Sequence, residues 1–260
     1  MATASGFSGN LTYADIADLS AGTPLVAKVQ VRKVARLKPA QAPGLRAGMA
    51  RVYIEGRTSA LLIGEGLGES IRFLADVPLT PKGDLPKLRK AETIVFARAV
   101  PERPGEIQLV APDGMIAWSQ PVEDRVRGIL RELVAPGAAP AIIGVREAAH
   151  VRGNLVGEGE TQIFLATPSG QPVSISVLRR PEAPPTWGVS LGEIVDQAAV
   201  PPTRDTLTWY RLACFLPNGV TPSTVLPGDD IDRRRAAEDY RYVRGELGAC
   251  PRNRPEAYRR

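Results

Sequence analysis

Hydrophobic and polar residues alternate with a period of two along much of the first half of the chain. In residues 24–38, Leu25, Ala27, Val29 and Val31 fall on one side of the alternation, and cations fill much of the other side. This pattern predicts a β-strand with one buried face. Four further runs are strand-like, and they cover Arg51–Ile63, Ser70–Val77, Glu92–Val100 and Glu106–Ala111. Connections that contain Pro and Gly separate the runs, so the sequence predicts five antiparallel strands.

These strands predict an architecture for the N-terminal half. Five short strands without a long helix among them are typical of small antiparallel barrels. We therefore expect residues 1–119 to form a five-stranded antiparallel β-barrel, either OB-like or SH3-like, with a small sandwich as the alternative. A short helix over Tyr13–Leu19 should precede the strands, because Thr12 can cap its first turn and Asp15 stands three residues later.

The period of the pattern changes near residue 120. Residues 121–134 carry an apolar stripe at helical spacing, and Glu123 and Asp124 suit the N-terminal end of a helix dipole. Two strand-like runs around the turn Pro168–Gly170 predict a β-hairpin. Further helices are predicted over Ser190–Ala199, Arg204–Phe215 and Asp230–Leu247. The expected fold class is thus α+β, and residues 120–260 should form a second α+β domain with a smaller sheet, a β-hairpin and C-terminal helices.

Composition says more about the compartment in which the protein is expected than about its function. The 260 residues carry a formal net charge of +5, and no apolar stretch approaches the ~20 residues that a transmembrane helix needs. The start of the chain shows no secretory signal, which favours a cytoplasmic protein, although a mature exported form would look the same. Cys214 and Cys250 are therefore expected as buried free thiols, and a disulfide between them would require an oxidising compartment.

The single histidine, His150, is the centre of one catalytic hypothesis. Glu147, Glu158 and Glu160 lie near it in sequence, and a histidine with a carboxylate partner can perform general acid–base chemistry. The alternative, which we favour, is an exposed histidine or one with a structural hydrogen bond at a helix end. The sequence does not decide whether the chain is an enzyme, because a Gly-x-Ser-x-Gly elbow is missing and many active sites have no local motif.

The motifs indicate no metal site and no cofactor. The glycine-rich segment 64–69 does not match a dinucleotide-binding loop, since Glu69 stands where that loop needs a glycine. Two cysteines are too few for an all-cysteine zinc site, and one histidine excludes sites that need two histidine ligands. The acidic run 229–232 lacks EF-hand spacing and instead suits the first turn of a helix.

Positive charge gathers in the strands of the first half. Residues 24–104 contain fifteen Lys or Arg and seven Asp or Glu. Strand alternation would place part of this charge on one exposed face together with an aromatic ring. The candidate binding residues on that face are Lys28, Arg32, Arg36, Arg51 and Tyr53. OB-like barrels bind single-stranded nucleic acid with such a face, but a solvated face that protects the sheet edge is the alternative that we favour.

The leading hypothesis for function is a non-enzymatic binding or protein-interaction protein, with another protein as the favoured partner. An acid–base or hydrolytic enzyme centred on His150 is the first alternative. Single-stranded nucleic-acid binding through the basic face is the second. The sequence identifies neither the partner nor the ligand.

Overall fold

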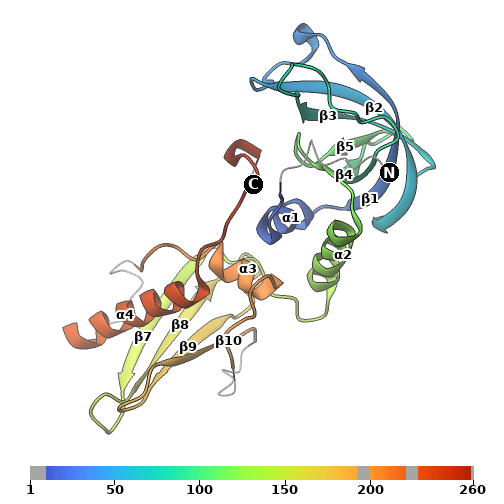
Figure 1. The fold of residues 1–260 in the computed structure, drawn as a ribbon. Helices are drawn as coiled ribbons and strands as arrows, with labels where there is room; N and C mark the ends of the chain where they lie inside the picture. Colours follow the sequence, from blue (N-terminus) through green and yellow to red (C-terminus); the bar gives the residue numbers. More distant parts are fainter. Residues whose placement is uncertain (1–9, 193–198, 221–227, 259–260) are drawn as a thin grey trace. The chain divides into compact units, whose positions relative to one another are not determined.

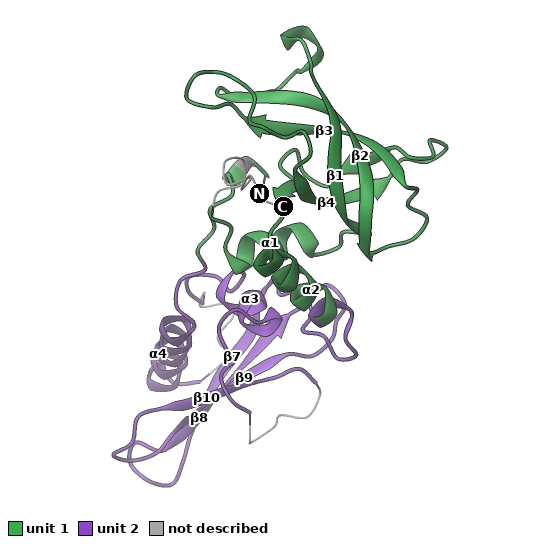
Figure 2. Ribbon diagram, turned by 45° about the vertical axis from the view of Figure 1, so that its right-hand side comes forward, with its two compact units in different colours: residues 1–131, 251–260 green, residues 132–250 purple. Residues whose placement is uncertain are grey.

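The chain folds into two compact units. The computed structural model describes residues 10–192, 199–220 and 228–258. The first unit comprises residues 1–131 and 251–260, and the second comprises residues 132–250 (Figure 2). The C-terminal residues therefore return to the unit that contains the N-terminus. The predicted division between residues 119 and 120 falls at the start of helix α2 (Gln120–Val134).

An antiparallel sheet with one curved core face forms most of the first unit (Figure 1). Its strands run in the order β3-β2-β1-β4-β5, and β6 pairs with β4. The strands are β1 (Leu25–Arg36), β2 (Met49–Ile63), β3 (Ser70–Pro78), β4 (Glu92–Ala99), β5 (Ile107–Leu109) and β6 (Met115–Ala117). Helix α1 (Tyr13–Ser20) precedes β1, and its first turn has the capping box predicted from Thr12 and Asp15.

The core of this unit follows from the alternation seen in the sequence. Inward-facing residues from every long strand meet in one apolar cluster that includes Val29, Ile54, Phe73 and Val95. Two strands approach closely at Gly56 in β2, where an added Cβ would lie 2.4 Å from Val29 Cγ1. A side chain at this position would displace the core, so a glycine is required there.

The expected β-barrel is wrong, because the sheet of the first unit does not close. Within the described residues, β3 and β5 share one isolated parallel bridge, between Arg72 and Glu106, and no continuous ladder. Beyond the end of β5, the Asp76 amide of β3 donates to the Pro112 carbonyl over 2.9 Å. A strand as short as β5 cannot follow β3 along its length, and the sheet stays open there.

The second unit is an open four-stranded antiparallel sheet. Its order is β10-β9-β8-β7, with β7 (Gly144–Arg152), β8 (Gly159–Ala166), β9 (Ser174–Arg179) and β10 (Thr186–Ser190). Helix α3 (Leu207–Ala213) and helix α4 (Asp230–Leu247) complete it, and α4 runs beside β7 and β8 (Figure 1). The two sheets and four α-helices of the described segments make the fold α+β, without the barrel.

Local signals located most of these elements but missed β7. The hairpin around Pro168–Gly170 and the bounds of α4 match the sequence predictions. The expected helix end at His150 is wrong, because that residue lies within strand β7. Of the predicted helix Ser190–Ala199, the first residue ends β10, and residues 193–198 lie outside the described part of the chain.

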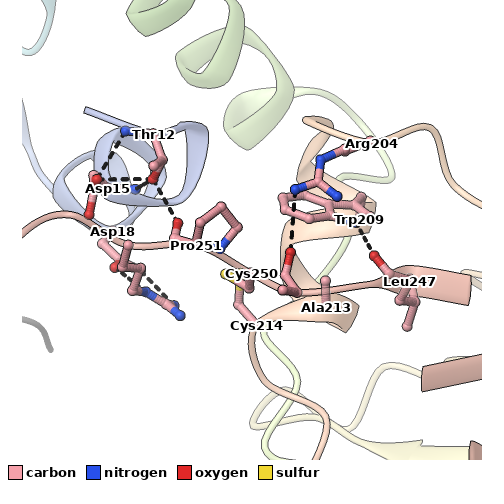
Figure 3. Close-up of a disulfide and its surroundings, with 12 residues drawn as sticks. Thr12, Asp15, Asp18, Arg204, Trp209, Ala213, Cys214, Leu247, Cys250 and Pro251 are labelled. Carbon is pink, nitrogen blue, oxygen red and sulfur yellow. Dashed lines mark hydrogen bonds and ion pairs between the residues drawn. A yellow bond between two sulfur atoms is a disulfide. The ribbon is translucent and has the colours of Figure 1, made fainter. Parts of the chain in front are cut away.

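A disulfide joins the ends of α3 and α4 (Figure 3). Cys214 is the C-cap residue of α3, and Cys250 follows α4 by three residues, with their Cα atoms 5.2 Å apart. The expectation of free thiols is therefore wrong. The neighbouring Trp209 reinforces the junction, since its indole N–H donates to the Leu247 carbonyl over 2.9 Å. The guanidinium of Arg204 lies 5.0 Å from the centre of the same ring.

The helices are too short or too polar to enter a bilayer as spanning segments. None of those in the described ranges combines the length and the apolar character that crossing a membrane requires.

Loss of the disulfide should destabilise the second unit. A cross-link between positions 36 residues apart restricts the unfolded chain, so the Cys214→Ala/Cys250→Ala variant should lose roughly 3–4 kcal/mol in free energy of unfolding. Urea denaturation with and without a thiol reductant measures this loss. The reductant should lower the midpoint of the native chain and leave that of the double variant unchanged. An equal midpoint for the native chain in both conditions would contradict the prediction.

Candidate functional site

A groove of about 600 Å³ lies in the first unit where β3 and β5 diverge. It occupies the stretch between the Arg72–Glu106 bridge and the Asp76–Pro112 hydrogen bond, so backbone contacts limit it at both ends. Its walls come from β2, β3, β5 and the residues that flank β5. The lining residues central to its chemistry are Arg51, Tyr53, Arg72, Leu74, Arg103 and Glu106.

Backbone groups of β3 face this groove without a strand partner. The amides of Arg72 and Asp76 both point away from β2, because they donate to Gly105 and Pro112 over 2.8 and 2.9 Å. Leu74 lies midway between them in the strand, so its N–H and C=O point the same way. In the described part of the chain, no ladder pairs Leu74 on this side of β3, because the bridge at Arg72 is isolated. The groove therefore offers a peptide-like donor and acceptor at its floor.

A buried carboxylate holds one arginine of the groove, and two other arginines keep hydrogen-bond donors available. Arg51 makes a bidentate pair with the buried Asp76, at 2.7 and 2.9 Å, and this pairing raises the pKa of Arg51 further above its ordinary value. Arg72 and Arg103 instead share the carboxylate of Glu106, at 4.0 and 3.4 Å. Two exposed guanidiniums on one carboxylate leave donors for an incoming anion.

Apolar surface accompanies these cations. Leu74 is 47% exposed and presents an aliphatic side chain beside the arginines of the groove. Tyr53 pairs with Leu74 across β2 and β3, and Val100 and Val110 contribute to the opposite wall. A concave surface with apolar walls and a few polar groups is the usual form of a ligand site.

A β-bulge reverses the alternation of β1 and takes Arg36 off the face on which the alternation predicts it. The register between β1 and β2 shifts between Val31 and Lys33, with Arg32 in the bulge. Arg36 consequently pairs with the core residue Val52 at the end of the strand. A bulge adds one residue to one strand, so every later side chain changes face.

Lys28 keeps the same face of the sheet as Tyr53, but its side chain is largely covered. Its ammonium group lies 3.6 Å from the centre of the Trp118 ring and 3.7 Å from the carboxylate of Glu123 in α2. The Trp118 indole donates to Glu123 over 2.6 Å and thereby lowers the pKa of that carboxyl. Of the five predicted binding residues, the groove therefore brings together two, Arg51 and Tyr53.

His150 belongs to a buried polar network in the second unit. Its Nδ1 lies 2.8 Å from the hydroxyl of Thr161, which donates to Asp239 over 2.5 Å. Thr161 donates its single hydroxyl proton to Asp239, so its oxygen can only accept from His150. We therefore place a proton on the Nδ1 atom of the His150 ring. Arg179 completes the network by donating to the other oxygen of Asp239 over 2.7 Å. Burial lowers the pKa of His150, with Asp239 acting in the opposite direction.

This network has the features of a structural element. The His150 side chain is 4% exposed, and its ring lies against Gly159, where an added Cβ would be 2.7 Å from Nε2. The ring therefore packs closely against the backbone of β8. His150 also lines neither the groove nor either of two other cavities of the described residues, of about 190 and 200 Å³.

The three glutamates expected beside His150 lie elsewhere. Glu147 and Glu160 occupy positions of odd offset from His150 and its partner Thr161, so they lie on the opposite face of the sheet. Glu158 accepts hydrogen bonds from the amides of Asn154 and Leu155 and holds the β7–β8 turn. Its carboxylate therefore has a structural role.

Sequence reasoning missed the carboxylate that serves His150. Asp239 is 78 residues from Thr161 in the chain and comes from the middle of α4, where it is fully buried. The one available signal is an aspartate on the apolar side of α4, one residue before Tyr240 and four before Val243. Buried carboxylates require partners, so this position predicts a polar contact but not its identity.

Metal ligands do not gather in the described segments. No group of three or more His, Cys, Asp or Glu side chains there could hold a metal ion.

Comparison with known proteins adds no assignment. No protein-family model matches the chain, and no curated protein shows significant similarity to it.

Removal of the Thr161 hydroxyl should destabilise the second unit. Thr161→Val leaves the Nδ1–H of His150 without an acceptor and takes a donor from Asp239, which should cost roughly 1–3 kcal/mol. Urea denaturation followed by tryptophan fluorescence detects this, since Trp187 and Trp209 both belong to that unit. Thr186→Val on the exposed edge of β10 is the matched control and should be nearly neutral. Equal midpoints for the two variants would count against the network.

Proposed function

We propose that the protein is a non-catalytic binding protein whose groove between β3 and β5 holds a short acidic segment of a partner protein. The observation that carries the proposal is the combination of Arg72 and Arg103 with the exposed Leu74 in one cavity of about 600 Å³. Arginines recognise carboxylates through paired N–H groups. An aliphatic floor beside them holds an apolar side chain of the same segment.

The backbone of the groove supports a peptide as the ligand. Leu74 offers an amide and a carbonyl to an incoming main chain, as an unpaired edge strand does. The contacts at Arg72 and Asp76 close the edge on both sides, so only a few residues of a partner chain fit between them. Recognition therefore depends on one acidic and one apolar side chain rather than on a long added strand.

Nucleic acid is the weaker candidate for this groove. Sequence-independent binding of single strands uses several aromatic side chains as stacking surfaces. Tyr53 is the one aromatic side chain beside the arginines at the mouth of the groove, since Phe73 belongs to the core cluster. Arg51 is already committed to Asp76, which reduces the charge available to phosphates.

An acid–base reaction at His150 has no support in the geometry. Proton transfer requires that a substrate atom approach the free ring nitrogen within hydrogen-bond distance. The His150 side chain is 4% exposed, and the neighbouring carboxylate is bound to Arg179. The network stabilises the second unit instead.

The disulfide bears on where the protein acts. Stable disulfides persist in oxidising compartments and are rare in the reducing cytosol. The bond between Cys214 and Cys250 therefore favours an oxidising compartment over the cytoplasm expected from the sequence. A partner of the groove would be met in that compartment.

Selection from a random peptide library displayed on phage tests the proposal. The immobilised full chain should enrich peptides that combine Asp or Glu with an aliphatic residue. Affinities of the enriched peptides, measured by fluorescence anisotropy, should fall roughly tenfold or more for the Arg72→Glu/Arg103→Glu variant, because each lost charge-assisted contact contributes about 1.5–3 kcal/mol.

Arg180→Glu/Arg241→Glu is a charge-matched control for this experiment, since both arginines are exposed in the second unit and lie outside the groove. It should bind the selected peptides as the native chain does. Equal losses for both variants would reduce the effect to net charge and contradict a specific groove. A parallel titration with single-stranded DNA, tight in the native chain and lost only in the groove variant, would replace the protein partner with nucleic acid.

A further inference from the structure

The C-terminal segment 251–258 lies in a polar cleft of the first unit and is held as a bound peptide would be. The Thr12 hydroxyl donates to the Pro251 carbonyl over 2.8 Å (Figure 3). The Asn253 side-chain amide donates to the Asn10 carbonyl over 2.5 Å. Residues from the two ends of the chain therefore make direct main-chain and side-chain contacts, and we name residues 251–258 the tail.

One buried carboxylate binds the main chain of the tail. Asp15 accepts hydrogen bonds from the backbone amides of Asn253 and Arg254, at 2.9 and 3.0 Å, while it also closes the capping box of α1. Burial acts to raise the pKa of Asp15, but the amides of Arg254, Thr12 and Asn253 outweigh it and lower the pKa below its ordinary value. Asp15 is therefore charged at neutral pH and recognises two consecutive N–H groups.

Two further carboxylates form ion pairs with arginine side chains of the tail. Arg252 makes a bidentate pair with Asp18 of α1, at 2.7 and 3.2 Å. Arg254 makes a second bidentate pair with Asp113, which follows β5, at 2.9 and 2.7 Å. The Arg254 side chain is 3% exposed, so the cleft encloses one guanidinium almost completely. The spacing of the two arginines and the planar geometry of both pairs make the recognition selective for Arg-x-Arg.

The contacts of the tail are polar, and its packing is incomplete. A cavity of about 200 Å³ remains beside it, lined by tail residues and by core residues of the sheet. The residues that border this cavity include Met49, Asp76, Met115, Arg254, Pro255 and Tyr258. A partner segment that supplies the same hydrogen bonds and ion pairs would replace those that the tail gives up.

We propose that this cleft is a recognition site for Arg-x-Arg peptide segments, and that the tail is its occupant within the same chain. A partner protein that presents an extended Arg-x-Arg segment would bind Asp15, Asp18 and Asp113 in place of residues 252–254. The tail competes with that partner as a tethered ligand, so its local concentration sets how strongly a partner must bind. This site adjoins the groove at Asp76 but differs from it in its ligand-binding side chains and in ligand charge.

A fluorescent synthetic peptide with the sequence of residues 251–260 tests this site on the full chain. In the Arg252→Ala/Arg254→Ala variant the tail loses both side-chain anchors, which vacates the cleft. Anisotropy titration should show that the peptide binds this variant at least about tenfold more tightly than it binds the native chain, where the tethered tail competes.

Two controls define the site. Asp18→Asn and Asp113→Asn, added to the vacated variant, should remove most of the peptide affinity. A peptide with glutamate in place of both arginines should not bind. A second vacating variant, Asn253→Pro, removes one amide donor to Asp15 and keeps both arginines, so it should also expose the cleft to the peptide.

Specific outcomes would overturn the proposal. One is equal peptide affinity for the native and vacated chains, which would place binding elsewhere. Another is the absence of binding by a vacated chain whose circular dichroism spectrum is native. Loss of folded structure in both vacated variants would also overturn it, since the tail would then be a fixed part of the first unit.

Discussion

The carboxylate of Asp15 is the constraint on which the first unit depends. It caps the first turn of α1 through Thr12 and, with the same two oxygens, accepts the amides of Asn253 and Arg254. One buried charge thereby fixes the start of the first helix and the return of the C-terminal segment. A buried carboxylate is tolerated only when its oxygens are satisfied, so the two ends of the chain stabilise each other.

The open sheet and the groove have one cause. The three-residue strand β5 meets β3 at Arg72 and again beyond its end at Asp76, and the strands diverge between these points. A closed barrel would have paired Leu74 and removed the cavity. The carboxylate of Asp76 also orients Arg51. The amide of Asp76 donates to Pro112, and the residue after Pro112, Asp113, binds Arg254. The groove and the tail cleft are therefore adjacent features of one sheet edge, with different ligand charges.

The register of the strands, and not the composition of the chain, decides where the cationic side chains of β1 lie. The bulge at Arg32 separates Lys28 from Arg36, and Trp118 and Glu123 then cover Lys28. Cations that look equivalent along β1 consequently have different surroundings. The positive net charge of the chain does not define a binding face, and the useful arginines are those that a neighbouring carboxylate leaves partly free.

The sequence by itself determined the elements whose signals are local. The period-two runs located β1 to β4, the capping residues Thr12 and Asp15 placed α1, and the acidic start and final glycine bounded α4. Only the tertiary structure decided whether the first sheet closed, where the bulge fell, which cysteine state was adopted and that Asp239 rather than a nearby glutamate serves His150. Capping and periodicity depend on residues a few positions apart. Strand pairing, disulfide formation and the satisfaction of buried charges depend on partners brought together by the fold, which no local pattern specifies.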